Sequence, residues 1–179
     1  MRKWKSGGCY SVLAVNRCMN CIGKSGGICV MWKSDMVIDL LIFSQDHINM
    51  TITEVGGKVW RLTGFYGRPE RSLRCHSWTL LKRLVGMAHL PWVCIGDFDE
   101  ILSDSDKFGG ADRNWRTMSD FRETLEDCEL ENMGFIGPRF TWSNKKAGNA
   151  LIMERLDRSF CHKGWKVLFP HSFVRHLDF

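Results

Sequence analysis

The sequence predicts a mixed domain of the α/β (α+β) class, and three observations support this. Successive β-forming runs with short turns between them fill residues 28–66, which is typical of an antiparallel meander. A helical pattern then lies between two such runs, and strand, helix, strand in that order implies a crossover and a sheet covered by helices. Finally, 44% hydrophobic and 25% charged residues is an ordinary globular composition, and 179 residues suit one domain or a large part of one.

The first part of the chain is expected to consist of strands. Residues 1–26 show at most one, near Tyr10–Val15. Further strands are expected at Ile28–Lys33, Val37–Phe43, Ile48–Val55 and Lys58–Tyr66. Apolar and polar residues alternate along the run that begins at Ile48, which indicates a strand with one face in the core. Gly56-Gly57 predicts a two-residue hairpin turn after it.

The middle of the chain contains the stretch that most resembles a site. A helix is expected over residues 73–87, followed by a short apolar run at 91–95 that is typical of a buried central strand. Asp97, Asp99 and Glu100 come directly after it. Because loops after buried strands often hold reacting groups, two acids separated by one residue could serve a hard cation or a water. An ordinary polar turn is the alternative interpretation.

Shorter elements are expected in the last third. Ser119 is a plausible N-cap for a helix that ends near Cys128, with Phe121 and Leu125 on its inner side. The remaining expectations are a strand over residues 140–144, a turn at 145–149, a longer strand over 151–160, a short helix over 163–169 and a last strand over 172–177.

Charge and cysteine content restrict the class of protein less strongly. The formal net charge is +5, and the basic residues are spread along the chain, for example Arg68, Arg71, Arg74 and Arg113. This permits a polyanionic partner without demanding one.

The eight cysteines are scattered and no apolar signal segment precedes them, so a reducing, intracellular compartment is expected rather than secretion. Cys18 and Cys21 have zinc-like spacing, but no second pair follows. No apolar run approaches the ~20 residues of a membrane span.

An ordered series of motifs carries a resemblance to a known family. The motifs are GGICVMW, RLTGFYG, PWVCIGDFDEIL, GG-x-x-R, MSDFRETLEDCEL, FTWSN, ERLDR and HLDF. Through them, residues 23–179 resemble the endonuclease/exonuclease/phosphatase (DNase I-like) domain of plant LINE-type non-LTR retrotransposons, whereas residues 1–22 match poorly. The resemblance implies a four-layer sandwich of two mainly antiparallel sheets flanked by helices, and hydrolysis of a phosphodiester with Mg²⁺ or Mn²⁺.

The resemblance also implies partners and a location. DNA would be the substrate, nicked before reverse transcription by a reverse transcriptase domain of the parent element. An intracellular protein is implied, with the nucleus as a candidate location and no membrane as a partner. Neither the oligomeric state nor the target sequence follows from it.

Six polar residues receive roles from the resemblance. Asp97, Tyr66 and Asp99 would be catalytic: Asp97 would orient the attacking water or its activator, and Tyr66 would lie near the phosphate. Asp97 or Asp99 could hold the metal. Substrate binding or bracing of the site would fall to Thr141, Ser143 and Asp157.

Each role has a structural alternative. Tyr66 could simply pack its ring, and the polar face of an ordinary strand would explain Thr141 and Ser143. Asp157 has arginines on either side in the sequence and could form a surface ion pair of little consequence.

Departures from the family pattern bear on activity. Asp99 stands where the family's GDFN pattern has asparagine, and an ionised carboxylate can only accept hydrogen bonds and adds negative charge beside an anionic substrate. The family's N-terminal asparagine and metal-binding glutamate have no counterpart before Glu54, and the Ser-Asp-His that follows HLDF in the family is absent. We therefore expect a domain that is incomplete at both ends and inactive as it stands.

Two other interpretations stay open. The chain could be a non-catalytic, degenerate fragment of a retrotransposon reading frame that binds nucleic acid weakly at most. It could also act on a small phosphate ester, although no residues indicate a pocket for one.

Overall fold

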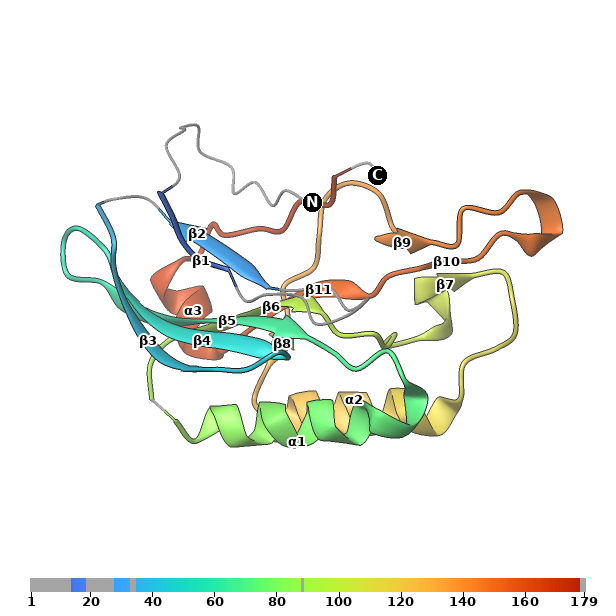
Figure 1. Ribbon diagram of the computed structural model, residues 1–179, viewed down its shortest axis with the longest axis horizontal. Coiled ribbons are helices and arrows are strands. Elements are labelled where there is room, and N and C mark those ends of the chain that lie inside the picture. The colour runs from blue at the N-terminus through green and yellow to red at the C-terminus, as the bar shows by residue number, and fades with distance from the viewer. Residues whose placement is uncertain (1–13, 19–27, 33–34, 88, 178–179) are drawn as a thin grey trace.

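The computed structural model describes residues 14–18, 28–32, 35–87 and 89–177, and Figure 1 shows the arrangement of their elements. Most of the strand expected near Tyr10–Val15, and Cys21 of the cysteine pair, lie outside these residues. The strands are β1 (Ala14–Cys18), β2 (Cys29–Trp32), β3 (Val37–Phe43), β4 (His47–Thr53), β5 (Val59–Tyr66), β6 (Trp92–Asp97), β7 (Lys107–Phe108), β8 (Glu131–Asn132), β9 (Trp142–Ser143), β10 (Met153–Glu154) and β11 (Asp157–Cys161). The helices are α1 (Arg74–Val85), α2 (Trp115–Asp127) and α3 (Lys163–Leu168), with short 3-10 turns η1 (Arg71–Leu73), η2 (Asp104–Asp106) and η3 (Gly148–Ala150).

A mixed six-stranded sheet is the centre of the fold. Its strand order is β3-β4-β5-β6-β11-β8, and β5 and β6 are its parallel pair, joined by the crossover through α1. The pairs on either side are antiparallel. A three-stranded sheet of order β7-β10-β9 and a two-stranded pair β1-β2 accompany it. The expected α+β class with two mainly antiparallel sheets is confirmed, and the structure adds that the two sheets differ in size.

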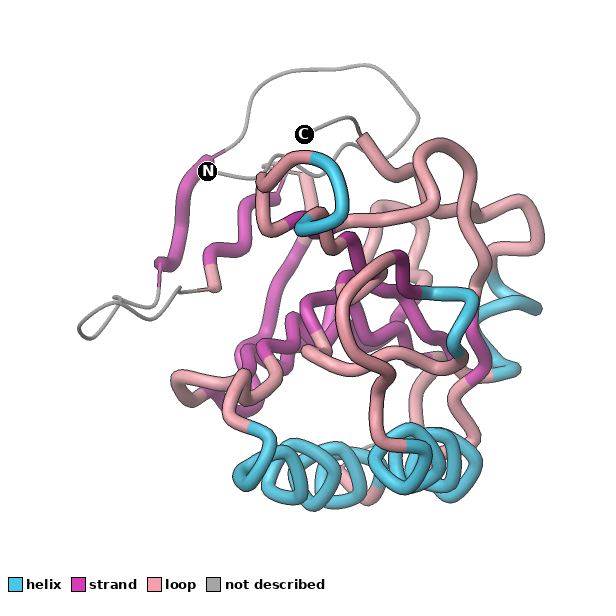
Figure 2. The backbone as a smooth tube through the Cα atoms, turned by 90° about the vertical axis from the view of Figure 1, so that its right-hand side faces the viewer, coloured by secondary structure: helices cyan, strands magenta, loops and turns pink. Residues whose placement is uncertain are grey.

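Each face of the large sheet has its own core. In Figures 1 and 2, α1 and α2 cover one face, whereas α3 and the β1-β2 pair lie over the other. The helix-covered face buries Trp92 and Cys94 against Trp78 of α1 and Phe121 of α2. Val93, which lies between Trp92 and Cys94 in the sequence, belongs to the core of the opposite face with Trp165 of α3. Both sides of β6 are therefore buried, as the continuous apolar run predicts.

The strands of the meander form as expected because their signals are local, but β4 is buried on both faces, since Asn49 is buried as well as Ile48 and Met50. Residues Val37–Phe43 form β3, and β4 pairs antiparallel with β3 and β5. The turn between β4 and β5 contains Gly56 and Gly57, whose φ angles of 100° and 82° are readily adopted only by glycine. No helix of the described ranges has the length and apolarity needed to cross a bilayer.

The predicted start of α2 was wrong. The helix begins at Trp115, and Asn114 is its N-cap, with a side-chain oxygen that accepts the N–H of Arg116 at 2.9 Å. Ser119 lies inside the helix, where its hydroxyl donates to Glu123 at 3.1 Å. Asparagine and serine are about equally good N-caps. The helix begins after the earlier of the two residues and is therefore longer than expected. The inner side was correct, because Phe121 and Leu125 are buried.

Two expected strands also differ from the structure. The run over residues 151–160 is not one strand, because the chain leaves the small sheet after β10 and enters the large sheet as β11. Leu156 lies at this crossing and packs with Ile101 and Met118. Residues 172–177 form only an isolated bridge, between Arg175 and Ile136, because His176 and its neighbours turn toward the segment at 135–138 instead of joining a sheet.

Candidate functional site

Three of the candidate residues form a row across adjacent strands. Tyr66 at the end of β5 is paired with Asp97 at the end of β6, and Asp97 is paired with Asp157 at the start of β11. Directly paired residues point to the same face of a sheet. Val93 and Cys161, which share their strands and alternation with Asp97 and Asp157, lie in the core of the α3 face. The row therefore faces away from α1 and α2.

The loop after β6 is held by Phe98 and by the acids beside it. Phe98 is fully buried and stacks on Phe65, with ring centroids 4.8 Å apart. Asp99 has a left-handed backbone with φ of 55°, and its N–H donates to Oδ1 of Asp97 at 3.0 Å. The side chain of Asp97 thus stabilises a backbone conformation that, among residues other than glycine, asparagine and aspartate adopt most readily. The turn therefore fixes the positions of Asp97 and Asp99 relative to each other.

The electrostatic surroundings of Asp99 are unusual for a carboxyl group. Burial raises the pKa of Asp99 to about 6, and the charges of Asp157 and Glu70 act in the same direction. Arg74 and Arg113 oppose the shift without cancelling it. Asp99 is therefore mainly ionised above pH 7 and gains a proton near pH 6, where it can donate a hydrogen bond.

Thr141 and Ser143 have different roles although they lie two residues apart. The hydroxyl oxygen of Thr141 accepts the N–H groups of Leu156 and Asp157, at 3.1 and 3.0 Å, and so fixes the start of β11 beneath the row. The hydroxyl oxygen of Ser143 accepts the N–H of Lys145 at 3.1 Å in the β9–β10 hairpin. The structure brings Thr141 to the row but leaves Ser143 in the hairpin.

Asp157 is not a surface residue. It is buried, and the arginines that flank it in the sequence extend to Asp106: Arg158 at 2.6 Å and Arg155 at 3.8 Å. Arg158 is itself fully buried. Asp157 therefore lies among buried charges at the start of β11, which differs from a solvated ion pair.

Glu100, the third acid of the loop, is structural. It is fully buried, and one of its oxygens accepts from Arg74 of α1 at 2.6 Å. The other oxygen accepts the N–H of Ile101 at 3.0 Å. Since both oxygens have partners, Glu100 ties the loop to α1 and is not a candidate for substrate or metal binding.

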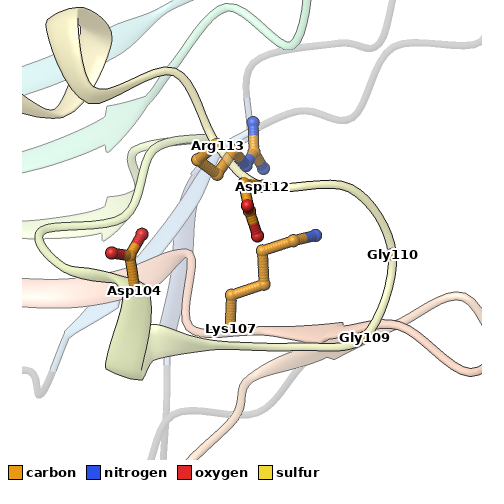
Figure 3. Close-up of a pocket in the computed structure, with 6 residues that line it drawn as sticks. All are labelled: Asp104, Lys107, Gly109, Gly110, Asp112 and Arg113. Carbon is orange, nitrogen blue, oxygen red and sulfur yellow. The ribbon is translucent and has the colours of Figure 1, made fainter.

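A small polar cavity of about 100 Å³ lies in the loop that leads from η2 to α2 (Figure 3). Its lining residues are Asp104, Lys107, Gly109, Gly110, Asp112 and Arg113. Lys107 and Arg113 both donate to Glu154 of β10, at 2.8 and 3.1 Å. Burial raises the pKa of Glu154, but these hydrogen bonds outweigh it and leave the pKa below its usual value. Both cations are held by Glu154. Two carboxylates, Asp104 and Asp112, line the same cavity, so its lining has no excess of positive charge that would favour an anion.

The acids of the row offer limited metal ligation. The described parts of the chain contain no group of three or more His, Cys, Asp or Glu residues that could hold a metal ion. Asp97 and Asp157 nevertheless lie opposite one another on one face. Mg²⁺ often binds through one or two carboxylates together with substrate phosphates. Asp97 and Asp157 fit a site of this kind, in which the protein supplies only two ligands.

Sequence reasoning missed the arginines that approach the site. Arg74 and Arg113 act on Asp99, and Arg68, two residues after Tyr66, forms an ion pair with Asp46 at 2.7 Å. In the sequence they are ordinary members of a scattered basic set. The position of Arg68 directly after a strand that ends in Tyr66 is the one local signal that could have distinguished it.

Comparisons were made with family models, curated proteins and solved structures. No protein-family model and no curated protein matches the sequence. Among solved structures, the endonuclease domain of TRAS1, a telomere-specific non-LTR retrotransposon, is similar with a TM-score of 0.57 and 15% identity, over 82% of this chain and 67% of that chain. A β-hairpin deletion mutant of beta toxin from Staphylococcus aureus has a TM-score of 0.48 and 18% identity, over 75% and 50% of the two chains. The human Nocturnin catalytic domain has 0.46 and 12%, over 74% and 50%.

The first of these likenesses supports the α+β fold described above, with its six-stranded and three-stranded sheets, which is consistent with a DNase I-like sandwich. At 15% identity the likeness concerns the fold. What the site does must be argued from its own residues.

Proposed function

We propose that this chain carries a phosphodiesterase-type site that acts on DNA, in the manner of a retrotransposon endonuclease. The observation that supports it is the row of Tyr66, Asp97 and Asp157, which gathers a phenol and two carboxylates at one end of three neighbouring strands. These residue types suit phosphodiester hydrolysis, which needs an oriented water and relief of charge on the phosphate.

Each member of the row has a distinct part in the proposal. Asp97 orients the attacking water or the group that activates it, and its fixed turn prepares that position before substrate arrives. The hydroxyl of Tyr66 donates to a phosphate oxygen. Thr141 contributes indirectly, since it fixes the backbone of Asp157. Ser143 would contact the substrate only if the DNA strand reached the β9–β10 hairpin.

A divalent metal completes the proposal. Asp97 with Asp157 would hold Mg²⁺ or Mn²⁺ together with oxygens of the bound phosphate. The metal would neutralise charge on the phosphate. A binding readout is available without turnover: Mg²⁺ should raise the melting temperature of the unaltered chain, and less so that of an Asp97→Asn variant.

Binding without turnover is a second candidate, and Asp99 favours it. An ionised carboxylate beside the row repels the phosphate and cannot donate to it, so chemistry at neutral pH would be slow or absent. The parent element would then carry a weakened nuclease together with a separate reverse transcriptase domain, and it would act in the nucleus.

A plasmid-nicking assay with Mg²⁺ tests the proposal. Asp97→Asn is the sharpest variant, because it keeps an oxygen that can accept from Asp99 and replaces the charged carboxylate by a neutral amide. Glu126→Gln, which removes a carboxylate charge at an exposed position of α2, is a matched control. Nicking that is lost in Asp97→Asn and kept in the control supports catalysis. DNA binding without nicking supports the second candidate, and absence of both contradicts the proposal.

A further inference from the structure

We propose that Arg68 is a preorganised phosphate contact for the nucleic-acid strand, placed beside the row on its β5 side. This rests on the proposed function in one respect, namely that nucleic acid is the ligand. The residue lies two positions after Tyr66, in the connection between β5 and η1, and its side chain is 39% exposed. It is thus accessible to a ligand that reaches the row.

The guanidinium of Arg68 is held in place by Asp46. One terminal nitrogen donates to Oδ2 of Asp46 at 2.7 Å. Asp46 lies in a tight turn between β3 and β4, where its N–H donates to the hydroxyl oxygen of Ser44 at 3.1 Å and its carbonyl accepts the N–H of Tyr66 at 2.8 Å. The carboxylate that orients Arg68 is therefore fixed to the same strand end as Tyr66.

The backbone around Arg68 is fixed as well. The N–H of Arg68 donates to the hydroxyl oxygen of Ser77 at 3.1 Å, and the N–H of Gly67 donates to the carbonyl of Asp97 at 2.6 Å. The guanidinium of Arg74 reaches the carbonyl of Pro69 at 3.4 Å. Hydrogen bonds on both sides of Arg68 thus restrict the chain, which lowers the entropy lost when its side chain binds a ligand.

The chemistry of the pair suits a phosphate diester. A guanidinium carries five N–H donors in a planar fork, and the bond to Asp46 uses one of them. The remaining donors can bind two phosphate oxygens side by side, which a lysine ammonium cannot match in geometry. Because Asp46 offsets part of the charge, we expect the contact to depend on oriented hydrogen bonds as well as on attraction between charges.

Binding of a fluorescent duplex DNA in EDTA, followed by anisotropy at several salt concentrations, tests this without any contribution from catalysis. Arg68→Ala should weaken binding about tenfold and reduce the slope of log Kd against log salt by about 1. Arg68→Lys should restore the slope but only part of the affinity. Lys82→Ala is the matched control, since it removes a cation from an exposed ion pair on α1, away from the row.

The possible outcomes separate this proposal from the preceding one. A loss specific to Arg68→Ala, with an unchanged melting temperature, supports the contact. Equal binding by the Arg68→Ala, Lys82→Ala and unaltered chains overturns the contact and leaves the proposed function standing. Full affinity in Arg68→Lys also overturns it, because a point charge would then suffice. If the unaltered chain does not bind DNA at all, both proposals are contradicted.

Discussion

The backbone N–H of Asp99 and Oδ1 of Asp97 lie 3.0 Å apart, and this hydrogen bond holds Asp99 in its left-handed conformation. Asp97, on which the row depends, therefore also shapes the loop that carries Asp99. Replacing Asp97 by alanine would disturb both features, whereas asparagine removes the charge but keeps an oxygen that can accept the N–H of Asp99. Variants in this loop must be chosen to separate geometry from electrostatics.

Asp99→Asn should stabilise the protein increasingly as the pH rises. The folded pKa of Asp99 is about 6, above the ordinary value of 3.8, so its protonated form is favoured by folding. That contribution is fully present below pH 3.8 and is lost as the pH rises through 6, whereas asparagine does not titrate. Since one pKa unit corresponds to about 1.4 kcal/mol and solvent weakens the effect, we expect a gain of about 1 kcal/mol at pH 8 relative to pH 4.

Urea unfolding of both proteins at pH 4, 6 and 8 measures this difference. Asparagine also suits a positive φ better than most residues, which adds a constant offset. Only the pH-dependent part is decisive. A difference that stays the same from pH 4 to pH 8 would show that burial does not raise the pKa of Asp99.

Thr141→Val should destabilise the start of β11. Valine has nearly the same shape as threonine but cannot accept the N–H groups of Leu156 and Asp157, which the hydroxyl oxygen now accepts. Leaving buried N–H groups without partners costs about 1–3 kcal/mol each at most, and we expect about 2 kcal/mol in total. Thr141→Ser keeps the oxygen and is the control. Equal urea midpoints for the two variants would refute the bracing role.

Gly67→Ala should separate β5 from the loop after β6. A Cβ at this position would lie 2.6 Å from the carbonyl oxygen of Phe98, which is too close without a backbone shift. We expect a loss of about 2 kcal/mol. Gly86→Ala is the matched control, because its nearest neighbour would be 3.9 Å away and a slight gain is expected. Thermal melts compare the two; similar melting temperatures would mean that the close approach is unimportant.

Local patterns predicted β3, β4, β5 and β6 of the large sheet, but neither the short strand β8 nor the changes between sheets. Alternation and turn glycines are visible within a few residues, which is why β3, β4 and β5 were correct. The break at Leu156 is different. It depends on the pairing of Arg155 and Arg158 with Asp106, which belongs to a distant turn, and no pattern within residues 151–160 encodes it.

The candidate site could likewise be predicted only in part. Motifs nominated Tyr66, Asp97 and Asp157 separately, but only the registers of β5, β6 and β11 make them neighbours. Arg68 and Asp46 are 22 residues apart in the sequence, and nothing local relates them before β4 and β5 are paired. Long-range ion pairs of this kind require the fold.

The rate of Mg²⁺-dependent plasmid nicking by Asp99→Asn tests the central claim most directly. Asparagine replaces a carboxylate that repels the phosphate with an amide that can donate to it. If the row is a phosphodiesterase site, Asp99→Asn should nick at least tenfold faster than the unaltered chain at pH 7.5. Asp97→Asn in the same background should remove that gain. No gain from Asp99→Asn, or a gain that survives the loss of the Asp97 charge, would contradict a hydrolytic site at this row.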